Sequence, residues 1–153
     1  MVTGRKRIYL DACCLNRPFD DQAQDRIRLE SEAVLLILDK LERGAWQWIG
    51  SDVLFFEIEK APDLDRRRRV RLLAEGVHHR VPLRKGEVER AKQLESLGFF
   101  SYDALHLACA EKGGAQVFLT TDDHFLRVAS RHLKKIKVRV ENPLRWIEKE
   151  VAK

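Results

Sequence analysis

The sequence has few cysteines and no long apolar segment, and each shortage excludes a class of protein. Cys13, Cys14 and Cys109 are an odd set without C-x-x-C spacing, so we expect neither a disulfide framework nor a zinc knuckle. No apolar run approaches the roughly 20 residues that cross a bilayer, and residues 1–6 do not begin a charged-then-apolar signal segment. The sequence therefore predicts a soluble cytoplasmic protein with no membrane partner.

Internal repeats, low-complexity segments and a domain linker are missing from the sequence as well. A chain of 153 residues is long enough to bury a hydrophobic core and too short for two domains of ordinary size, so we expect one domain over residues 1–153. The formal net charge of +5 favours a polyanionic partner such as nucleic acid, although a basic surface that only faces solvent would give the same net charge.

Short apolar runs alternate with amphipathic segments along the chain. The runs predict strands at 7–11, 46–49, 77–83, 116–120 and 136–140. Helical spacing predicts helices over 24–43, 53–59, 64–75, 86–97, 103–111, 125–133 and 144–151, and Pro18 predicts a loop over 12–21. This alternation predicts an α/β fold, a three-layer α/β/α sandwich with a mainly parallel five-stranded sheet.

Four acidic residues stand where one crevice can gather them. Asp11 and Asp122 follow apolar strands, Asp103 opens an alanine-rich apolar helix, and Glu57 lies in a helix with apolar neighbours. In parallel α/β sheets the ligand crevice lies outside the carboxyl ends of the strands. Because clustered carboxylates in buried settings need a partner or a cation, the pattern indicates a divalent metal site.

Each of these acids also has an ordinary structural interpretation. Asp103 and Asp122 are both suitable helix N-caps, since aspartate is among the preferred capping residues. Asp11 is a plausible turn residue at a strand end, and Glu57 is a plausible solvated helix residue. The four interpretations are reasonable one by one, but they do not explain why all four acids fall near one edge of the sheet.

Several further residues are left open by the sequence. His106 follows Asp103 by about one helical turn on the same face, so it either reaches the acids or is a satisfied core histidine. Glu59 and Asp123 are rivals or additions to the acids beside them. The arginine-rich stretch 66–71 either contacts phosphates or forms a solvated helix face.

Four sequence blocks resemble the acidic motifs of the PIN-domain family. They are Ile8–Asp11, the spacing from Ser51 to Glu57, Tyr102–Ala108 and Phe118–Phe125. The blocks follow the family's order and span nearly the whole chain, and the third and fourth are the most specific. The resemblance implies an α/β/α sandwich with a parallel sheet and a metal-dependent ribonuclease, of which the VapC-like toxins of prokaryotic toxin–antitoxin pairs are one group.

The resemblance also implies a set of site residues, a cofactor and partners. The implied catalytic and metal-binding residues are Asp11, Glu57, Asp103 and Asp122. Thr120 is the implied supporting hydroxyl, the implied cofactor is Mg²⁺ or Mn²⁺, and the implied partners are an RNA substrate, a cognate antitoxin and a second copy of the chain. One position departs from the family, which often has Ser, Thr or Asn where this chain has Cys13, a poorer hydrogen-bonding residue.

The chemistry of the four acids is coherent with a hydrolase. Oxygen ligands suit Mg²⁺ or Mn²⁺, and a bound cation relieves the repulsion among carboxylates that otherwise raises their pKa values. We expect direct hydrolysis by water without a covalent intermediate, and the family implies products that carry a 5′-phosphate. The alternative is a non-catalytic nucleic-acid or protein-binding module, which Cys13 favours. A haloacid-dehalogenase-like phosphatase would need a second Asp at the position of Cys13, and the acids do not follow the order of a phosphorelay receiver.

Overall fold

The computed structural model describes residues 4–153, and within them five parallel strands form one sheet in the order β3-β2-β1-β4-β5. The strands are β1 (Arg7–Leu10), β2 (Gln47–Ser51), β3 (His79–Val81), β4 (Val117–Leu119) and β5 (Arg139–Glu141). β1 lies at the centre, where Tyr9 pairs with Ile49 on one side and with Phe118 on the other. The parallel α/β fold expected from the alternation of elements is confirmed. Residues 1–3 of the expected domain lie outside the described residues.

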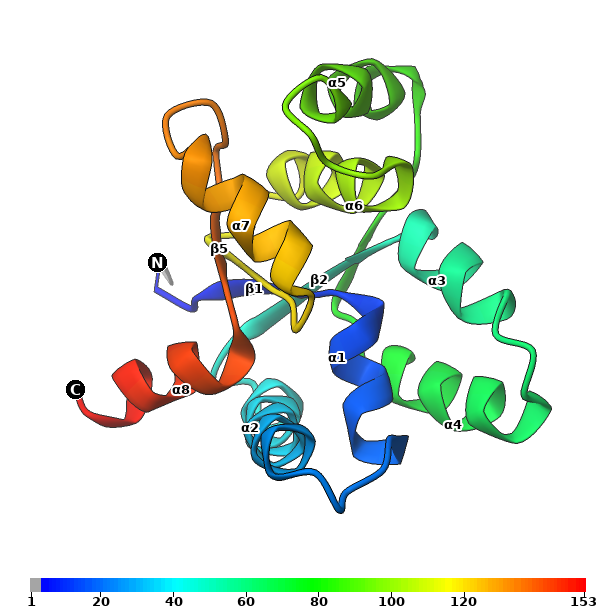
Figure 1. Cartoon of the computed structure of the whole chain (residues 1–153), viewed down its shortest axis with the longest axis vertical. Coiled ribbons are helices and arrows are strands. Elements are labelled where there is room, and N and C mark those ends of the chain that lie inside the picture. The colour runs from blue at the N-terminus through cyan, green and yellow to red at the C-terminus, as the bar shows by residue number, and fades with distance from the viewer. Residues whose placement is uncertain (1–3) are drawn as a thin grey trace.

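Helices cover both faces of this sheet, as Figure 1 shows. They are α1 (Ala12–Asn16), the 3-10 turn η1 (Arg17–Phe19), α2 (Asp25–Glu42), α3 (Asp52–Glu59), α4 (Leu64–Ala74), α5 (Lys85–Glu95), α6 (Ser101–Lys112), α7 (Asp123–Arg131) and α8 (Pro143–Val151). In Figure 1, α5 and α6 lie above the sheet and α2 and α8 lie below it. Among residues 4–153, no helix combines the length and the apolar character that crossing a bilayer requires.

The core is divided into two clusters by the sheet. Along β1, Ile8 and Leu10 pack into one cluster with Val34 of α2, whereas Tyr9 packs into the other with Leu107 of α6. Successive side chains of a strand point to opposite faces, and all three strand residues are fully buried. A strand covered on both faces has no polar side, which explains why this run is continuously apolar.

Several elements differ from their predicted bounds, among them β3, which is shorter than the predicted 77–83, and two segments have a clear local cause. Residues 12–19 are helical instead of a loop, because the Asp11 side chain caps α1 by accepting a hydrogen bond from the Ala12 N–H at 2.8 Å. Pro18 fits the first turn of η1, where its missing N–H is not needed. The last strand begins at Arg139 and not at residue 136, because the Lys137 N–H donates to the Glu111 side chain at 3.0 Å instead of pairing with β4.

Candidate active site

The topology brings the predicted site residues to one edge of the sheet. β1 and β4 are parallel neighbours, so Asp11 and the segment 120–122 leave the sheet at the same edge. The Asp11 N–H extends the pairing of these strands by donating to the Leu119 carbonyl at 3.0 Å. On the other side of β1, strand β2 ends at Ser51, and α3 begins there and carries Glu57.

Asp11 is a nearly buried carboxylate, 5% exposed, and both of its oxygens are held by hydrogen bonds. Its Oδ1 accepts from the Ala12 N–H at 2.8 Å, and its Oδ2 accepts from the Thr120 hydroxyl at 2.8 Å. Burial and the negative charge of Glu57 raise the pKa of Asp11 above its usual value, despite the opposing effects of His106 and the hydrogen bonds. An acid that is fixed in place and incompletely compensated is suited to hold a cation.

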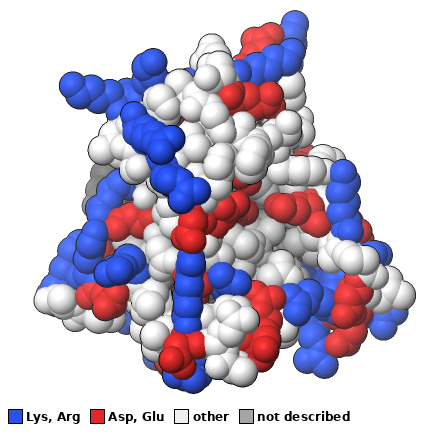
Figure 2. All heavy atoms as spheres, viewed as in Figure 1, with Lys and Arg blue, Asp and Glu red and all other residues white. Residues whose placement is uncertain are grey.

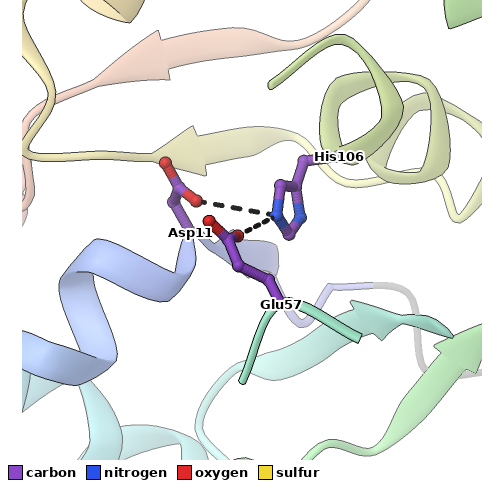
Figure 3. A group of neighbouring side chains, drawn as sticks. All are labelled: Asp11, Glu57 and His106. Atoms are coloured by element: carbon purple, nitrogen blue, oxygen red, sulfur yellow. Dashed lines mark hydrogen bonds and ion pairs between the residues drawn. The ribbon is translucent and has the colours of Figure 1, made fainter. Parts of the chain in front are cut away.

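Glu57 and His106 complete the group drawn in Figure 3, where the three side chains point toward one another. The Nε2 atom of His106 lies 2.6 Å from Oε1 of Glu57 and 3.9 Å from Oδ1 of Asp11. One ligand atom from each of the three residues lies within 4.8 Å of the other two, the spacing of a metal site. His106 is fully buried, whereas the Glu57 side chain is 39% exposed, so the acid forms the solvent-facing side of the group.

A buried chain of polar groups lies behind His106. The Tyr9 hydroxyl is 2.6 Å from Nδ1 of His106 and 2.6 Å from the Ser51 hydroxyl, which in turn accepts from the Leu54 N–H at 3.2 Å. Burial raises the pKa of Tyr9 well above its usual value, so this hydroxyl keeps its proton. Burial alone would lower the pKa of His106, but the hydrogen bond to Glu57 and the nearby carboxylate charges outweigh it and the pKa is raised.

The negative charges of the other acids act on the carboxyl group of Asp103. It is half-buried in the first turn of α6, and burial together with the charges of Asp11, Asp122 and, more weakly, Glu57 raises its pKa to about 7. The capping interpretation of Asp103 is wrong, because α6 begins at Ser101 and not at Asp103. The third predicted acid therefore does not cap its own helix, and it lies near enough to Asp11 and Asp122 for their charges to raise its pKa.

Asp122 has the capping role that the sequence allowed, and its role as a metal ligand stays a prediction. It is the N-cap of α7, where its Oδ1 accepts from the His124 N–H at 2.9 Å. Its own N–H donates to the Thr120 hydroxyl at 3.1 Å, and that hydroxyl also donates to Asp11. Thr120 thus joins the first and fourth acids, which matches the supporting position expected for it.

The two rival acids are neutralised by arginines of their own. Glu59 pairs with Arg71 at 2.9 Å, and Asp123 pairs with Arg26 at 2.8 Å. Both pairs are exposed, and neither acid belongs to the group around Asp11. The structure therefore separates Glu57 from Glu59, whereas among the described residues neither Asp122 nor Asp123 belongs to the group of Asp11, Glu57 and His106.

Cys13 keeps the contacts expected of the residue at its position. Its sulfur lies 3.4 Å from Oδ2 of Asp11 and 3.3 Å from the Thr120 hydroxyl oxygen, and it accepts from the Thr121 N–H at 3.3 Å. A thiol is a weak donor and acceptor, so these contacts are weaker versions of those that a serine or threonine hydroxyl would make.

A cavity of about 430 Å³ adjoins Glu57 and is lined by the cationic side chains of Arg17, Lys60 and Arg66. Arg66 belongs to the arginine-rich stretch and donates to Asp20 at 2.6 Å, so it is held in place by an ion pair. In Figure 2, acidic side chains lie near the centre of the view, and both basic and acidic side chains lie around them. The negative charge of Glu57 therefore lies beside cationic side chains, which attract anions.

The donor set fits a hard divalent cation. Carboxylate oxygens are the ligands that Mg²⁺ and Mn²⁺ prefer, and burial and the neighbouring acids raise the pKa values of Asp11 and Asp103. A bound cation would reverse that effect. Sequence reasoning found the acids from their positions after strands and in helices, but it missed the contact between His106 and Glu57, for which the only signal was the spacing of His106 from Asp103.

The fold and the site define a class of protein, an α/β/α domain whose parallel sheet carries an acidic centre at its carboxyl edge. The family model described as PIN domain matches residues 8–131, and the chain belongs to the PIN-domain family. The resemblance seen in the four sequence blocks is thereby confirmed. Members of this family are generally nucleases.

Two solved structures share the fold at low sequence identity. One is VapBC2 from Rickettsia felis bound to a DNA fragment from their promoter, with a TM-score of 0.55 and 13% identity over 89% of this chain and 98% of that chain. The other is PAE2754 from Pyrobaculum aerophilum, with a TM-score of 0.53 and 13% identity over 97% of this chain and 98% of that chain. No curated protein matches the sequence significantly.

Proposed function

We propose that this chain is a Mg²⁺- or Mn²⁺-dependent endoribonuclease that hydrolyses RNA phosphodiesters. The proposed catalytic and metal-binding residues are Asp11, Glu57, Asp103 and Asp122. The observation that carries the proposal is the convergence of these acids: Asp11 and Glu57 lie in one group with metal-ligand spacing, and Asp11, Asp122 and Glu57 all raise the pKa of Asp103.

The two acids of the group differ in their surroundings: Asp11 is buried and held by hydrogen bonds, and Glu57 is partly exposed to solvent. Asp11 is held by Ala12 and Thr120 and presents its carboxylate in one orientation. Glu57 faces solvent and the cavity, so it lies where a substrate phosphate and its attacking water would enter. A divalent cation bound to these acids would lower the pKa of water and stabilise the charge that develops on the phosphate oxygens.

The cations around the cavity support a phosphodiester substrate. Lys60 lines the same cavity as Glu57, together with Arg17 and Arg66, which are also paired with Asp20, and the chain carries a formal net charge of +5. Phosphates repelled by four carboxylates need compensating positive charge along their path. A pure binding module gains nothing from acids at the point where phosphates approach, and this favours the hydrolase over the non-catalytic alternative.

An antitoxin partner is the less direct part of the proposal. The solved structure from Rickettsia felis is a VapBC2 complex with promoter DNA, and the family resemblance includes VapC-like toxins. We therefore propose that the chain is the toxin of a type II toxin–antitoxin pair. A neighbouring short gene for a DNA-binding protein, whose product binds this chain and blocks its cleavage of RNA, would be the expected finding.

A matched pair of variants on α3 tests the nuclease. We expect Glu57→Gln to reduce metal-dependent cleavage of a mixed RNA pool by 10²-fold or more, and Glu59→Gln to leave it within about 3-fold. Both substitutions remove one negative charge from the same helix, so a difference in cleavage between the two variants shows that the position of Glu57 matters and not the loss of charge alone. Cleavage is measured with Mn²⁺ or Mg²⁺ and again with EDTA. The same assay is run on Asp11→Asn and, for the wild type, on a pool of single-stranded DNA.

Equal cleavage by the wild type and by Glu57→Gln would mean that the activity comes from a contaminant or from another site. If no RNA in the pool is cut, Mn²⁺ titration decides between the two candidate functions. A chain that binds Mn²⁺ through Asp11 and Glu57 remains a nuclease with a narrow target, whereas a chain that binds no Mn²⁺ is the non-catalytic module.

A further inference from the structure

We propose that His106 is the positioning residue of Glu57: its Nε2–H holds one carboxylate oxygen of Glu57 and leaves the other free for a cation or a substrate water. The inference rests on the proposed function and goes beyond the four acids. His106 comes from α6 and Glu57 from α3, so the contact also fixes the distance between two helices that border the site.

Glu57 needs such an anchor because it is the exposed member of the group. Its side chain is 39% exposed and has several rotatable bonds, whereas His106 is fully buried and offers a rigid ring. The distance from Nε2 to Oε1 of Glu57 is 2.6 Å, against 3.9 Å to Oδ1 of Asp11. The histidine therefore bonds to Glu57 and only approaches Asp11, which already has its own hydrogen-bond donors.

A carboxylate only accepts hydrogen bonds, so the contact with Glu57 calls for a hydrogen on Nε2 of His106, and the polar chain behind His106 is compatible with this in both charge states. If the imidazole is neutral, Nδ1 accepts from the Tyr9 hydroxyl at 2.6 Å and the hydrogen is on Nε2. If the imidazole is charged, Nδ1 donates to Tyr9, whose hydroxyl then donates to Ser51 at 2.6 Å. In both states Nε2 keeps its hydrogen for Glu57, in the way that outer hydrogen bonds orient the ligands of metal sites.

Two other roles for His106 make different predictions. A purely structural histidine would stabilise the fold without affecting cation binding. A metal-ligating histidine would need Nε2 without its hydrogen, and Glu57 would have to turn away from a contact of 2.6 Å. The shape of the side chain allows an experiment that separates the three roles.

The experiment compares His106→Gln with His106→Asn. A glutamine amide nitrogen occupies the place of Nε2 and can still donate to Glu57, whereas an asparagine amide reaches only the place of Nδ1 and contacts Tyr9. We expect His106→Asn to weaken Mn²⁺ binding by 10-fold or more and His106→Gln to stay within about 3-fold of the wild type. In a Glu57→Gln background, His106→Asn should cause no further loss.

Each alternative outcome overturns the inference. An ¹⁴N coupling in the pulsed EPR spectrum of bound Mn²⁺, lost in His106→Gln, would make His106 a ligand. An equal loss of affinity from His106→Asn with and without Glu57 would make its role structural. If Glu57→Gln itself leaves Mn²⁺ binding and cleavage unchanged, the proposed function fails as well, whereas a strong effect of Glu57→Gln with none from His106→Asn removes the positioning role alone.

A measurement on the metal-free protein with His106 intact covers the case in which the His106 variants do not fold. The ¹⁵N NMR signals of the His106 ring should show a protonated Nε2, and Glu57→Gln should shift that signal. An unprotonated Nε2, or one that is insensitive to Glu57→Gln, would contradict the positioning role.

Discussion

At Asp103, burial and neighbouring charge act in the same direction on one carboxyl group. Its pKa of about 7 lies well above the usual value of 3.8, because burial and the charges of Asp11 and Asp122 disfavour the ionised form. In the metal-free protein, the folded state therefore binds a proton at Asp103 more tightly than the unfolded chain does. The stability that this proton contributes is fully present below about pH 4 and is lost as the pH rises through about 7.

Removing this charge should stabilise the metal-free protein at alkaline pH. We expect Asp103→Asn to raise the free energy of unfolding at pH 8 by roughly 1–3 kcal/mol in EDTA, allowing for solvent screening, with the gain shrinking toward pH 4. Thermal unfolding at several pH values measures it. Mn²⁺ should reverse the order of stability, because the cation binds only the folded wild-type site.

Asp123→Asn is the control with the opposite sign. The ion pair with Arg26 lowers the pKa of Asp123, so its charge stabilises the folded state above about pH 4, and the variant should lose a little stability at pH 8. A gain in stability from both substitutions would show that reduced overall charge, and not the acidic site, is responsible.

At the scale of elements, the end of α6 shows how closely a helix approaches the sheet. A Cβ atom at Gly113 would lie 2.5 Å from Cγ2 of Ile49 and 2.8 Å from Cγ2 of Val81. The glycine is therefore required by its neighbours on β2 and β3 and not by its backbone angles, since its φ is −76°. α6 carries both Asp103 and His106, so this close packing also sets their distance from the sheet edge.

A pair of glycine substitutions tests this packing. Gly113→Ala should destabilise the protein by about 1–3 kcal/mol through overpacking. Gly86→Ala on α5, where a Cβ meets nothing within 4 Å, should stabilise it by up to about 1 kcal/mol, since alanine is the better helix former. Urea unfolding gives both values, and equal changes of one sign would contradict the packing argument.

At the scale of the whole molecule, one buried acid joins segments that are far apart in the sequence. Glu30 of α2 is 1% exposed and accepts hydrogen bonds from Arg17 of η1 at 2.8 Å and from Arg26 at 3.1 Å. It also accepts from Asn142, the N-cap of α8, at 2.6 Å. The charge of Glu30 is thus paired and fully bonded, the condition under which a buried carboxylate is tolerated.

Breaking this group should weaken the whole fold. Glu30→Ala is expected to lower the free energy of unfolding by about 1–3 kcal/mol, because it removes the acceptor shared by Arg17, Arg26 and Asn142, although Arg17 keeps Asp20 and Arg26 keeps Asp123. Glu32→Ala removes an exposed acid from the same helix and should change it by less than about 0.5 kcal/mol. A loss from Glu30→Ala no larger than that from Glu32→Ala would show that the group contributes little.

The sequence by itself determined the elements and the acids. Apolar runs and helical spacing depend on local chemistry, so the parallel α/β fold and most helices, including α2, α4 and α8, were predictable. The positions of Asp11 and Asp122 after strands were equally visible. The five-residue helix α1 was not, because it is too short for a periodic pattern and depends on its cap from Asp11.

Only the tertiary structure decided which polar groups meet. It turned Glu57 toward His106 and paired Glu59 with Arg71, although both acids lie on the same helix. It also placed Tyr9 behind His106 across 97 positions of sequence. Contacts of this kind are set by the packing of α3 and α6 against the sheet, and that packing is a property of the whole fold which no local stretch of sequence encodes.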